Sequence, residues 1–204
     1  MSNDGLRSVK QERSVERRDA ILRSSVHLFT SQRVSAITHR SVAADAGVPL
    51  GAIRYYFSTR EELLLASLHL IEARRHTDAQ RALAAAAPES STRDCARLLL
   101  HSYIGLPQGR SSLDADYLAS SVGWLADIPR ESGALAAQLA KHWPAIESDL
   151  AAILARCHRV VPPNLITHVI DGATLVGFAW EPGELVERVL DAVVEQLEFA
   201  RSRS

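Results

Sequence analysis

The sequence predicts an all-α protein, on the grounds of its composition and of the spacing of its apolar residues. Of its 204 residues, 47% are hydrophobic, which is ample for a buried core and rules out disorder for most of the chain. Only 5% are aromatic, and ten Gly and eight Pro leave little material for the turn-rich, β-branched runs of a sandwich or barrel. Long segments carry apolar residues at helical spacing instead. Helices are therefore expected throughout the chain.

The N-terminal region is expected to begin with an arm and to continue as an amphipathic helix. Residues 1–13 are mostly polar and show no apolar period, which predicts a flexible arm. From about 15 to 31, apolar side chains such as Ile21, Leu28 and Phe29 recur on one face. This face is expected to pack on a core while the intervening arginines point outward.

Two short helices joined by a tight turn follow. Thr38 is predicted to cap a helix over residues 39–46, because its hydroxyl can accept from the free amides of a first turn. Gly47 is predicted to end that helix, since glycine adopts the left-handed conformation without steric cost. Pro49 can then open a second helix that runs to Phe57 and is too short to be stable without packing.

A long helix is expected next. Thr59 is predicted to cap it, and Glu61 in its first turn suits the positive end of a helix. From Arg60 to Ala87 the helix would measure about 42 Å at 1.5 Å per residue. A small three-helix unit needs less than this for its own core, so the helix is expected to link two domains and to end at Pro88.

Proline and glycine residues separate five further stretches of helical periodicity. Helices are expected near residues 92–106, 113–126, 132–158, 163–180 and 184–201. Pro144 lies inside the third of these and is predicted to kink or split it.

Charge is distributed unevenly along the chain. Residues 1–60 hold ten Lys and Arg against five Asp and Glu, whereas the remainder holds thirteen against nineteen. A basic segment on an acidic body favours contact with a polyanion at one end, because arginines near phosphates release counterions. On charge alone, a merely solvated basic face is an equal alternative.

The two short helices and their turn have the layout of a helix-turn-helix DNA reader. The segments RRDAILRSSVHLF and THRSVAADAGVPLGAIRYYFSTREELL resemble the N-terminal domain of the tetracycline-repressor (TetR) family of bacterial transcriptional regulators. The resemblance covers about residues 14–68. It implies a flexible arm over 1–13, a DNA-binding domain over 14–60 and a helical ligand-binding and dimerisation domain over 61–204.

The resemblance also places particular residues at DNA. They are His39, Arg40, Leu50, Gly51, Ala52, Arg54, Tyr55, Tyr56 and Arg60. By similarity, His39 and Arg40 begin the first short helix close to DNA, and the residues from Leu50 to Tyr55 lie on the recognition helix. Tyr56 and Arg60 stand where the family contacts phosphate.

Alternatives remain for several of these residues. Arg54 can bind guanine bidentately, or it can pair with a nearby carboxylate. Tyr55 and Tyr56 are adjacent, so at least one of them is expected to face DNA while the other can pack inside the domain. Arg33, Pro49 and Arg54 depart from residues that are frequent in the family, so the operator sequence stays open.

A helix-turn-helix protein of this kind usually binds as a two-fold dimer. The last two helices carry apolar faces that are broad enough for burial on two sides. The residues predicted for dimerisation are Ile166, Ile170, Ala173, Gly177, Val186, Val189, Val193 and Leu197. The resemblance implies a four-helix bundle made from these helices of two subunits. The alternative is an ordinary core within one subunit.

In similar proteins the C-terminal domain binds a small inducer. Candidate lining residues are His101, Tyr103, Tyr117, Trp124, Trp143 and Trp180, which combine apolar rings with a few polar groups. For any one of them, core packing or plain surface is the alternative. The acidic body slightly favours a cationic ligand.

Other functional classes find little support in the sequence. No GxSxG elbow, phosphate-binding glycine loop or HExxH motif is present, which argues against an enzyme. Cys95 and Cys157 have no zinc-ligand spacing, so neither a metal nor a cofactor is expected. No apolar stretch is long enough to span a bilayer and the N-terminus lacks a signal-peptide centre, so a cytoplasmic protein is expected.

The predicted function is that of a homodimeric transcriptional regulator that binds a palindromic DNA operator. We expect a repressor that a small-molecule inducer releases from DNA by a population shift. The alternative is an architectural or constitutive DNA-binding protein without an inducer. A filled C-terminal core favours the alternative, whereas a sensor needs a cavity.

Overall fold

The computed structural model describes residues 3–107, 109–179 and 181–201, and within these ranges the chain forms α-helices and short 3₁₀ helices only. The predicted all-α class is therefore confirmed. The α-helices are α1 (Asn3–Phe29), α2 (His39–Asp45), α3 (Leu50–Tyr56), α4 (Arg60–Ala85), α5 (Thr92–Ile104), α6 (Ala115–Glu131), α7 (Gly133–Arg156), α8 (Pro163–Leu175) and α9 (Leu185–Arg201). The 3₁₀ helices are Val34–Ala36, Gly177–Ala179 and Pro182–Glu184.

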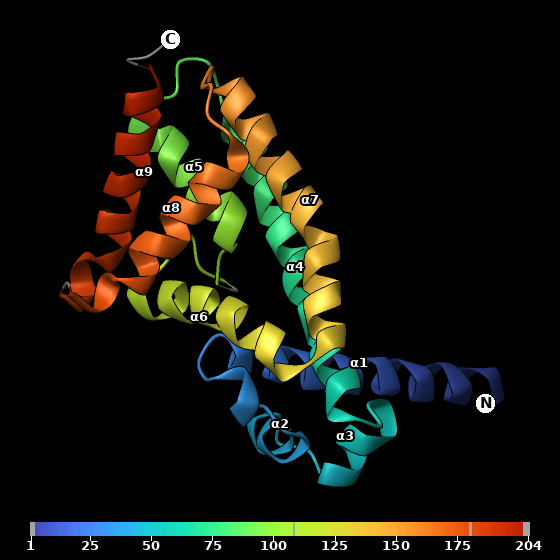
Figure 1. Cartoon of the computed structure of the whole chain (residues 1–204). Helices are drawn as coiled ribbons and strands as arrows, with labels where there is room; N and C mark the ends of the chain where they lie inside the picture. The colour runs from blue at the N-terminus through green and yellow to red at the C-terminus, as the bar shows by residue number, and fades with distance from the viewer. Residues whose placement is uncertain (1–2, 108, 180, 202–204) are drawn as a thin grey trace.

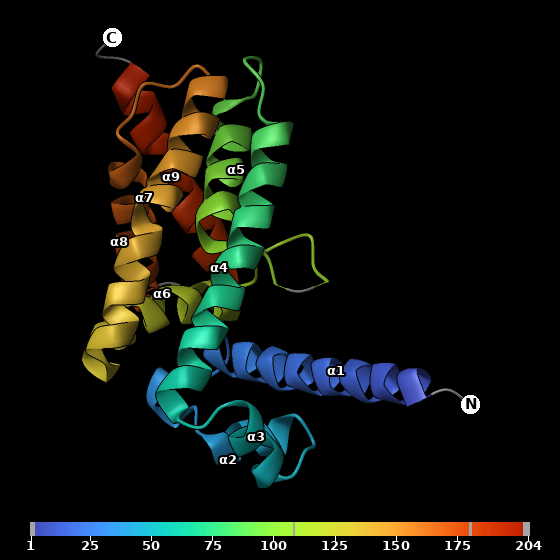
Figure 2. The same ribbon diagram turned by 90° about the vertical axis from the view of Figure 1, so that its right-hand side faces the viewer.

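The helices form a lower unit and an upper unit. The lower unit contains α1, α2, α3 and the start of α4, and the upper unit contains α5, α8, α9 and most of α7 (Figure 1). Helices α4 and α7 run side by side from the upper unit down to the lower unit, and the view at right angles shows the same arrangement (Figure 2). Helix α6 crosses between the units, so the upper body rests directly on the lower one.

Local capping sets the helix ends around α2 and α3, as the sequence predicts. The Thr38 hydroxyl accepts from the Ser41 amide at 3.1 Å, and the Ser41 hydroxyl accepts from the Thr38 amide at 2.8 Å. These two bonds form a capping box. Gly47 follows α2 with φ at +63°, in the left-handed region. Thr59 caps α4 by accepting from the Glu62 amide at 3.1 Å.

Several predicted boundaries are wrong. Residues 3–13 belong to α1, whereas the sequence predicts a flexible arm over residues 1–13. No proline interrupts this part of the helix. Helix α6 passes through Pro129 and ends two residues later. Helix α7 is continuous through Pro144, where packing along α4 holds it together. Helix α8 ends at Leu175, five residues earlier than predicted.

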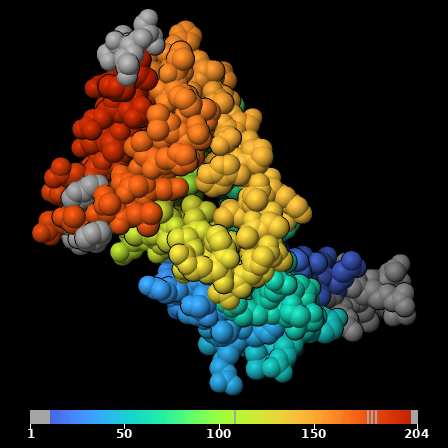
Figure 3. All heavy atoms as spheres, viewed as in Figure 1, coloured from blue at the N-terminus to red at the C-terminus, as the bar shows by residue number. Residues whose placement is uncertain are grey.

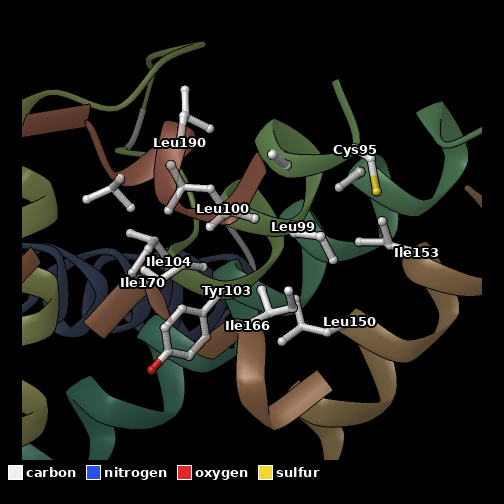
Figure 4. Packing of buried hydrophobic residues seen from close by; sticks show 14 of the residues in the cluster. Cys95, Leu99, Leu100, Tyr103, Ile104, Leu150, Ile153, Ile166, Ile170 and Leu190 are labelled. Atoms are coloured by element: carbon white, nitrogen blue, oxygen red, sulfur yellow. The ribbon is translucent and has the colours of Figure 1, made fainter. Parts of the chain in front are cut away.

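Two hydrophobic clusters make up the core. The upper cluster joins α5, α7, α8 and α9, and Figure 4 shows Leu99 and Leu100 of α5 packed among residues of the other helices. The lower cluster joins α1 to α4 around Phe29 and Phe57. It also contains Ile128 from α6 and Leu135 from α7, both fully buried. The helix-turn-helix therefore shares its core with the body above it.

Across the described ranges, none of the helices combines the length and the apolar character that crossing a membrane requires.

Candidate DNA-binding surface and ligand cleft

The two short helices bury one face and expose the other. Val42 of α2 and Ile53 of α3 are fully buried in the lower cluster. The opposite face lies at the end of the molecule away from the upper unit (Figure 3). Arg40, Arg54 and Tyr55 are exposed there, with 80% of Tyr55 accessible. The capped helix α2 and the short helix α3 thus present arginine and tyrosine side chains to solvent.

The arginines on this face are available to an external anion. Among the described residues, neither Arg40 nor Arg54 forms an ion pair or a side-chain hydrogen bond, so the alternative of a carboxylate partner for Arg54 receives no support. Gly51 in the first turn of α3 is exposed, and a Cβ built there meets no atom within 4 Å. Leu50 and Ala52 beside it are half-buried. Another backbone can therefore approach the start of α3 closely.

His39 and Tyr56 lie deeper than Arg40 and Tyr55. His39 is half-buried, and its Nε2 atom has no hydrogen-bond partner. The Tyr56 hydroxyl lies 3.0 Å from the Ser14 hydroxyl of α1, and its ring stands edge-on to that of Tyr55. Of the two adjacent tyrosines, Tyr55 is the one that the fold leaves open to DNA.

The Arg60 guanidinium, for which a phosphate contact is predicted, is half-buried and bonded inside the protein. Its Nε atom donates to the Ile37 carbonyl at 2.5 Å, and its Nη2 atom donates to the Val34 carbonyl at 2.6 Å. Its Nη1 atom pairs with the carboxylate of Glu131 at the end of α6. The guanidinium thus ties the segment before α2 to α6. A phosphate would have to compete with these internal acceptors, so the phosphate role does not suit Arg60.

The junction of α6 and α7 makes a second polar contact with the start of α4. The Ser132 hydroxyl, which caps α7, also donates to the Glu61 carboxylate. Together with the buried Ile128 and Leu135, this contact fastens the junction to the lower unit. A displacement of α6 would therefore be transmitted directly to the helix-turn-helix through these contacts.

A large cleft lies where the two units meet. It has a volume of about 610 Å³ and opens between the second half of α1, α4, the segment after α5 and the start of α6. Its apolar surface includes Ile71, Ile104 and Trp124, and its polar surface includes Arg74 and Tyr117. Burial raises the pKa of the Tyr117 hydroxyl, while the positive charge of Arg74 acts in the opposite direction. A small molecule could bind here in contact with both units.

A second, much smaller cavity lies among α4 to α7. The cavity bordered by α4 to α7 has a volume of about 30 Å³ and touches Tyr103, Trp124 and Trp143. Figure 4 shows the Tyr103 hydroxyl directed away from the neighbouring leucines. It lies 2.9 and 3.0 Å from the two carboxylate oxygens of Asp171. Burial raises the pKa of Asp171 to about 6.

A buried arginine, Arg75, lines both the cleft and this cavity and forms ion pairs inside the protein. Arg75, 5% exposed, donates to the Asp149 carboxylate at 2.9 Å and to the Ser102 carbonyl at 2.8 Å. It also pairs with Glu72 at 2.6 Å. With its donors satisfied inside the protein, Arg75 belongs to the scaffold.

The structure separates the predicted ligand residues. Tyr117 and Trp124 line the cleft, whereas Tyr103 and Trp143 line the small cavity with Trp124. His101 lies on neither lining, and burial together with the charge of Arg97 lowers its pKa. Trp180 lies outside the described residues.

Sequence reasoning missed the cleft residues on α1 and α4. Arg23 and Arg74 lie on its lining, but on the sequence they look like two of many outward arginines. Nothing in their spacing marks them, because the wall they form requires α1 to cross beneath the segment after α5. That crossing is a feature of the tertiary structure alone.

Most residues predicted for dimerisation lie in the chain's own core, which corrects that prediction. The fully or nearly fully buried ones are Ile166, Ile170, Val189, Val193 and Leu197. Gly177 allows close contact within the chain, because a Cβ there would collide with the Leu185 side chain. Ala173 and Val186 are half-buried. The broad apolar face of α9 is explained largely by packing against α5 and α8.

An apolar strip nevertheless remains exposed along α8 and α9. Leu175 and Val176 at the end of α8 are 58% and 49% exposed. Val169 on α8 and Val194 on α9 are half-buried. These side chains are the apolar surface that a second subunit could cover.

Comparison with known proteins places this architecture. No protein-family model matches the chain. An HTH-type transcriptional regulator, PksA of Bacillus subtilis, is 33% identical over 63 residues, and the alignment spans 31% of this chain and 31% of that protein. The chain thus covers less than a third of the length of that curated relative.

Solved structures match over nearly the whole chain. A TetR-family transcriptional regulator from Rhodococcus sp. has a TM-score of 0.63 at 22% identity and covers 89% of this chain and 99% of its own. A transcriptional regulator from Saccharomonospora viridis in complex with choline has a TM-score of 0.68 at 15% identity. The match covers 90% of this chain and 96% of that regulator. The multidrug-binding protein EbrR in complex with malachite green has a TM-score of 0.56 at 23% identity. The match covers 89% of this chain and 98% of EbrR. The chain therefore has the fold of the TetR-family regulators, which confirms at the level of fold the resemblance seen in the sequence.

Proposed function

We propose that this chain is a DNA-binding transcriptional regulator that acts as a homodimeric repressor on a palindromic operator and is released by a small-molecule inducer. The observation that carries the proposal is the exposed face of α2 and α3, from which Arg40, Arg54 and Tyr55 project. Neither arginine has an ion-pair or side-chain hydrogen-bond partner among the described residues. DNA binding in turn implies action in the cytoplasm.

The chemistry of this face suits the reading of DNA. The second helix of a helix-turn-helix enters the major groove, where a guanidinium can donate two hydrogen bonds to one guanine. Arg54 lies on α3 and is proposed to make that contact, while Arg40 and Tyr55 contact the backbone or base edges nearby. The excess of basic residues over 1–60 adds attraction that does not depend on sequence. Gly51 permits close approach of α3.

The proposal keeps a DNA-binding domain over residues 14–60 and a ligand-binding and dimerisation domain over 61–204. Dimers of such readers place their heads about 34–36 Å apart on DNA. For the dimer we propose the strip with Val169, Leu175 and Val176 on α8 and Val194 on α9, which keeps apolar area exposed in one subunit. Solved structures of this fold with bound choline or malachite green support a ligand response as part of the proposal.

The test is titration of the purified protein onto the DNA that flanks its own gene, with a scrambled duplex as control and salt varied. We expect tight binding to one palindromic segment. Arg54→Ala should weaken that binding by about 1–3 kcal/mol and relax specificity at one base pair, because one base contact is lost. Arg97→Ala is the matched control, since Arg97 is an exposed arginine on α5. Equal, salt-sensitive binding to both duplexes would contradict a sequence-specific regulator.

A second candidate is a DNA-binding protein that needs no inducer. The observation in its favour is the small size of the cavity among α4 to α7, which measures about 30 Å³. The cleft of about 610 Å³ at the junction of the units favours the inducer-responsive function. Occupancy of that cleft is therefore the property that separates the two candidates.

A further inference from the structure

The cleft between the two units combines unpaired cationic groups with an apolar floor. Ile71 and Ile104 contribute to the floor, and Trp124 contributes an aromatic ring. Arg74 enters from α4 and Arg23 from α1. In the described part of the chain neither arginine has an ion-pair or hydrogen-bond partner, although Arg74 is half-buried. An unpaired, half-buried guanidinium is costly unless a ligand or water satisfies it.

The other charged groups of the cleft are largely neutralised. Arg110 pairs with Asp114. Asp78 pairs with Arg81 at 2.7 Å and also accepts from the Leu106 amide at 2.9 Å. Together with the internally bonded Arg75, these groups leave little net charge of their own.

The remaining charges favour an anion. One further charged side chain on the lining, that of Asp116 at the start of α6, has no partner among the described residues. Its carboxylate is exposed. Two free guanidinium groups therefore face one free carboxylate. The Tyr117 hydroxyl, within the influence of Arg74 and bonded to Ser121, adds a neutral polar group on the facing wall.

We propose that this cleft binds an amphipathic carboxylate, with its anionic group at Arg74 and Arg23 and its apolar part on Ile71, Ile104 and Trp124. Guanidinium groups bind carboxylates through two parallel hydrogen bonds, which gives an arginine site its preference for planar anions. An apolar part is expected in the ligand as well, because Ile71, Ile104 and Trp124 give the cleft an apolar surface beside the arginines. This assignment reverses the slight preference for a cation that the acidic composition indicates.

The effector role of the site rests on the proposed regulatory function, whereas its occupancy does not. The ligand would contact α1, α4 and α6 together, and α6 is fastened to the helix-turn-helix by Arg60 and Glu131. A ligand that binds one placement of α6 better than another shifts the population of DNA-binding heads.

Binding is tested by calorimetric titration of the full chain with decanoate and with decylammonium, both below their micellar concentrations. We expect decanoate to bind, the matched cation to bind at least about tenfold more weakly, and decanoate affinity to fall about tenfold or more in Arg74→Gln. Arg23→Gln, on an exposed part of α1, should weaken it in the same direction. Arg97→Gln, an exposed arginine away from the cleft, should leave it unchanged.

Three results would overturn the proposal: no decanoate binding at millimolar concentration, unchanged binding in both Arg74→Gln and Arg23→Gln, or equal or tighter binding of decylammonium. Circular dichroism of each variant shows whether it is folded, and Arg23→Gln keeps the test decisive if Arg74→Gln is not. The same proteins are titrated onto the flanking DNA. Decanoate binding without specific DNA binding would leave the cleft assignment standing and reject the proposed regulatory function.

Discussion

At the scale of single residues, the same side chain takes different roles according to the acceptors around it. Arg40, Arg54 and Arg60 lie within 21 residues of one another on a basic segment. Arg40 and Arg54 point away from the fold, whereas Arg60 has carbonyl and carboxylate acceptors in reach and forms an internal tie. Charge counting treats the three alike, but the structure assigns only two of them to an exposed face.

Gly51 offers a test of how closely α3 approaches DNA. Gly51→Ala should raise the free energy of unfolding by about 0.5–1 kcal/mol, because alanine is the better helix former and its Cβ meets no atom within 4 Å. The same change should weaken specific DNA binding, since the added methyl group lies on the proposed contact face. Urea unfolding and DNA titration measure the two effects.

Gly123→Ala on α6 is the matched control, because its Cβ also meets nothing within 4 Å and it lies away from α2 and α3. It should stabilise the protein without changing DNA affinity. If Gly51→Ala also left DNA affinity unchanged, close approach of DNA to the start of α3 would be ruled out.

At the scale of elements, the amphipathic pattern predicts which face of a helix is buried but not what covers it. Ile166 and Ile170 on α8 and Val189 and Val193 on α9 repeat at helical spacing, as a dimer face would. In the structure α8 and α9 pack on each other, α8 also packs on α7, and α9 also packs on α5 of the same chain. A period in the sequence carries no information on the partner, because any apolar surface satisfies it.

Helix α8 also carries a half-buried carboxyl group, that of Asp171, whose ionisation should limit stability. Burial raises the pKa of Asp171 to about 6, although the Tyr103 hydroxyl and the charge of His168 act in the opposite direction. An exposed aspartate titrates near roughly 3.9. The folded protein therefore holds more protons between about pH 4 and pH 6, so this group lowers the free energy of unfolding as pH rises through that window.

Asp171→Asn should remove this effect. We expect the variant to be more stable than the parent at pH 7 by about 1–2 kcal/mol, a figure reduced for partial exposure, and to show a smaller loss between pH 4.5 and pH 6.5. Urea unfolding across this range measures it. Asp127→Asn, a half-buried carboxyl on α6, is the control. A parent and an Asp171→Asn variant with parallel pH profiles would contradict the assignment.

At the scale of the whole molecule, the two units share a core through α6 and the start of α7. Ile128 is fully buried among residues of the helix-turn-helix, while Val122, six residues earlier on the same helix, is buried in the upper cluster. One helix thus contributes to both clusters. This continuity supports the proposal that a ligand bound at the junction affects the exposed face of α2 and α3.

Ile128→Ala should lower the free energy of unfolding by about 2–4 kcal/mol and should speed amide hydrogen exchange most in α2 and α3. Val122→Ala is the control on the same helix, and its effect should be concentrated in α5 and α9. The measurement is hydrogen exchange resolved by peptide. If the two variants gave the same exchange pattern, the clusters would not open separately.

The exposed face of α2 and α3 could be predicted from the sequence, whereas the cleft could not. Arg40, Arg54 and Tyr55 could be named from the sequence, because the layout of the helix-turn-helix and its resemblance to the TetR family indicate which positions lie on the outer face. Arg23 and Arg74 could not, because the cleft exists only where α1 crosses below the segment after α5. The proposed ligand cleft is not lined by Tyr103 or Trp143, which border the small cavity instead.

The sequence by itself determined the helical class, the caps at Thr38 and Thr59, the turn at Gly47 and the layout of the helix-turn-helix. These features depend on hydrogen bonds and steric limits that act within about four residues, so the order of side chains is enough to specify them. The tertiary structure decided the tie at Arg60, the partners of α8 and α9, and the position of the cleft. Each of these depends on groups far apart in the chain, whose meeting is set by the packing of whole helices and not by local spacing.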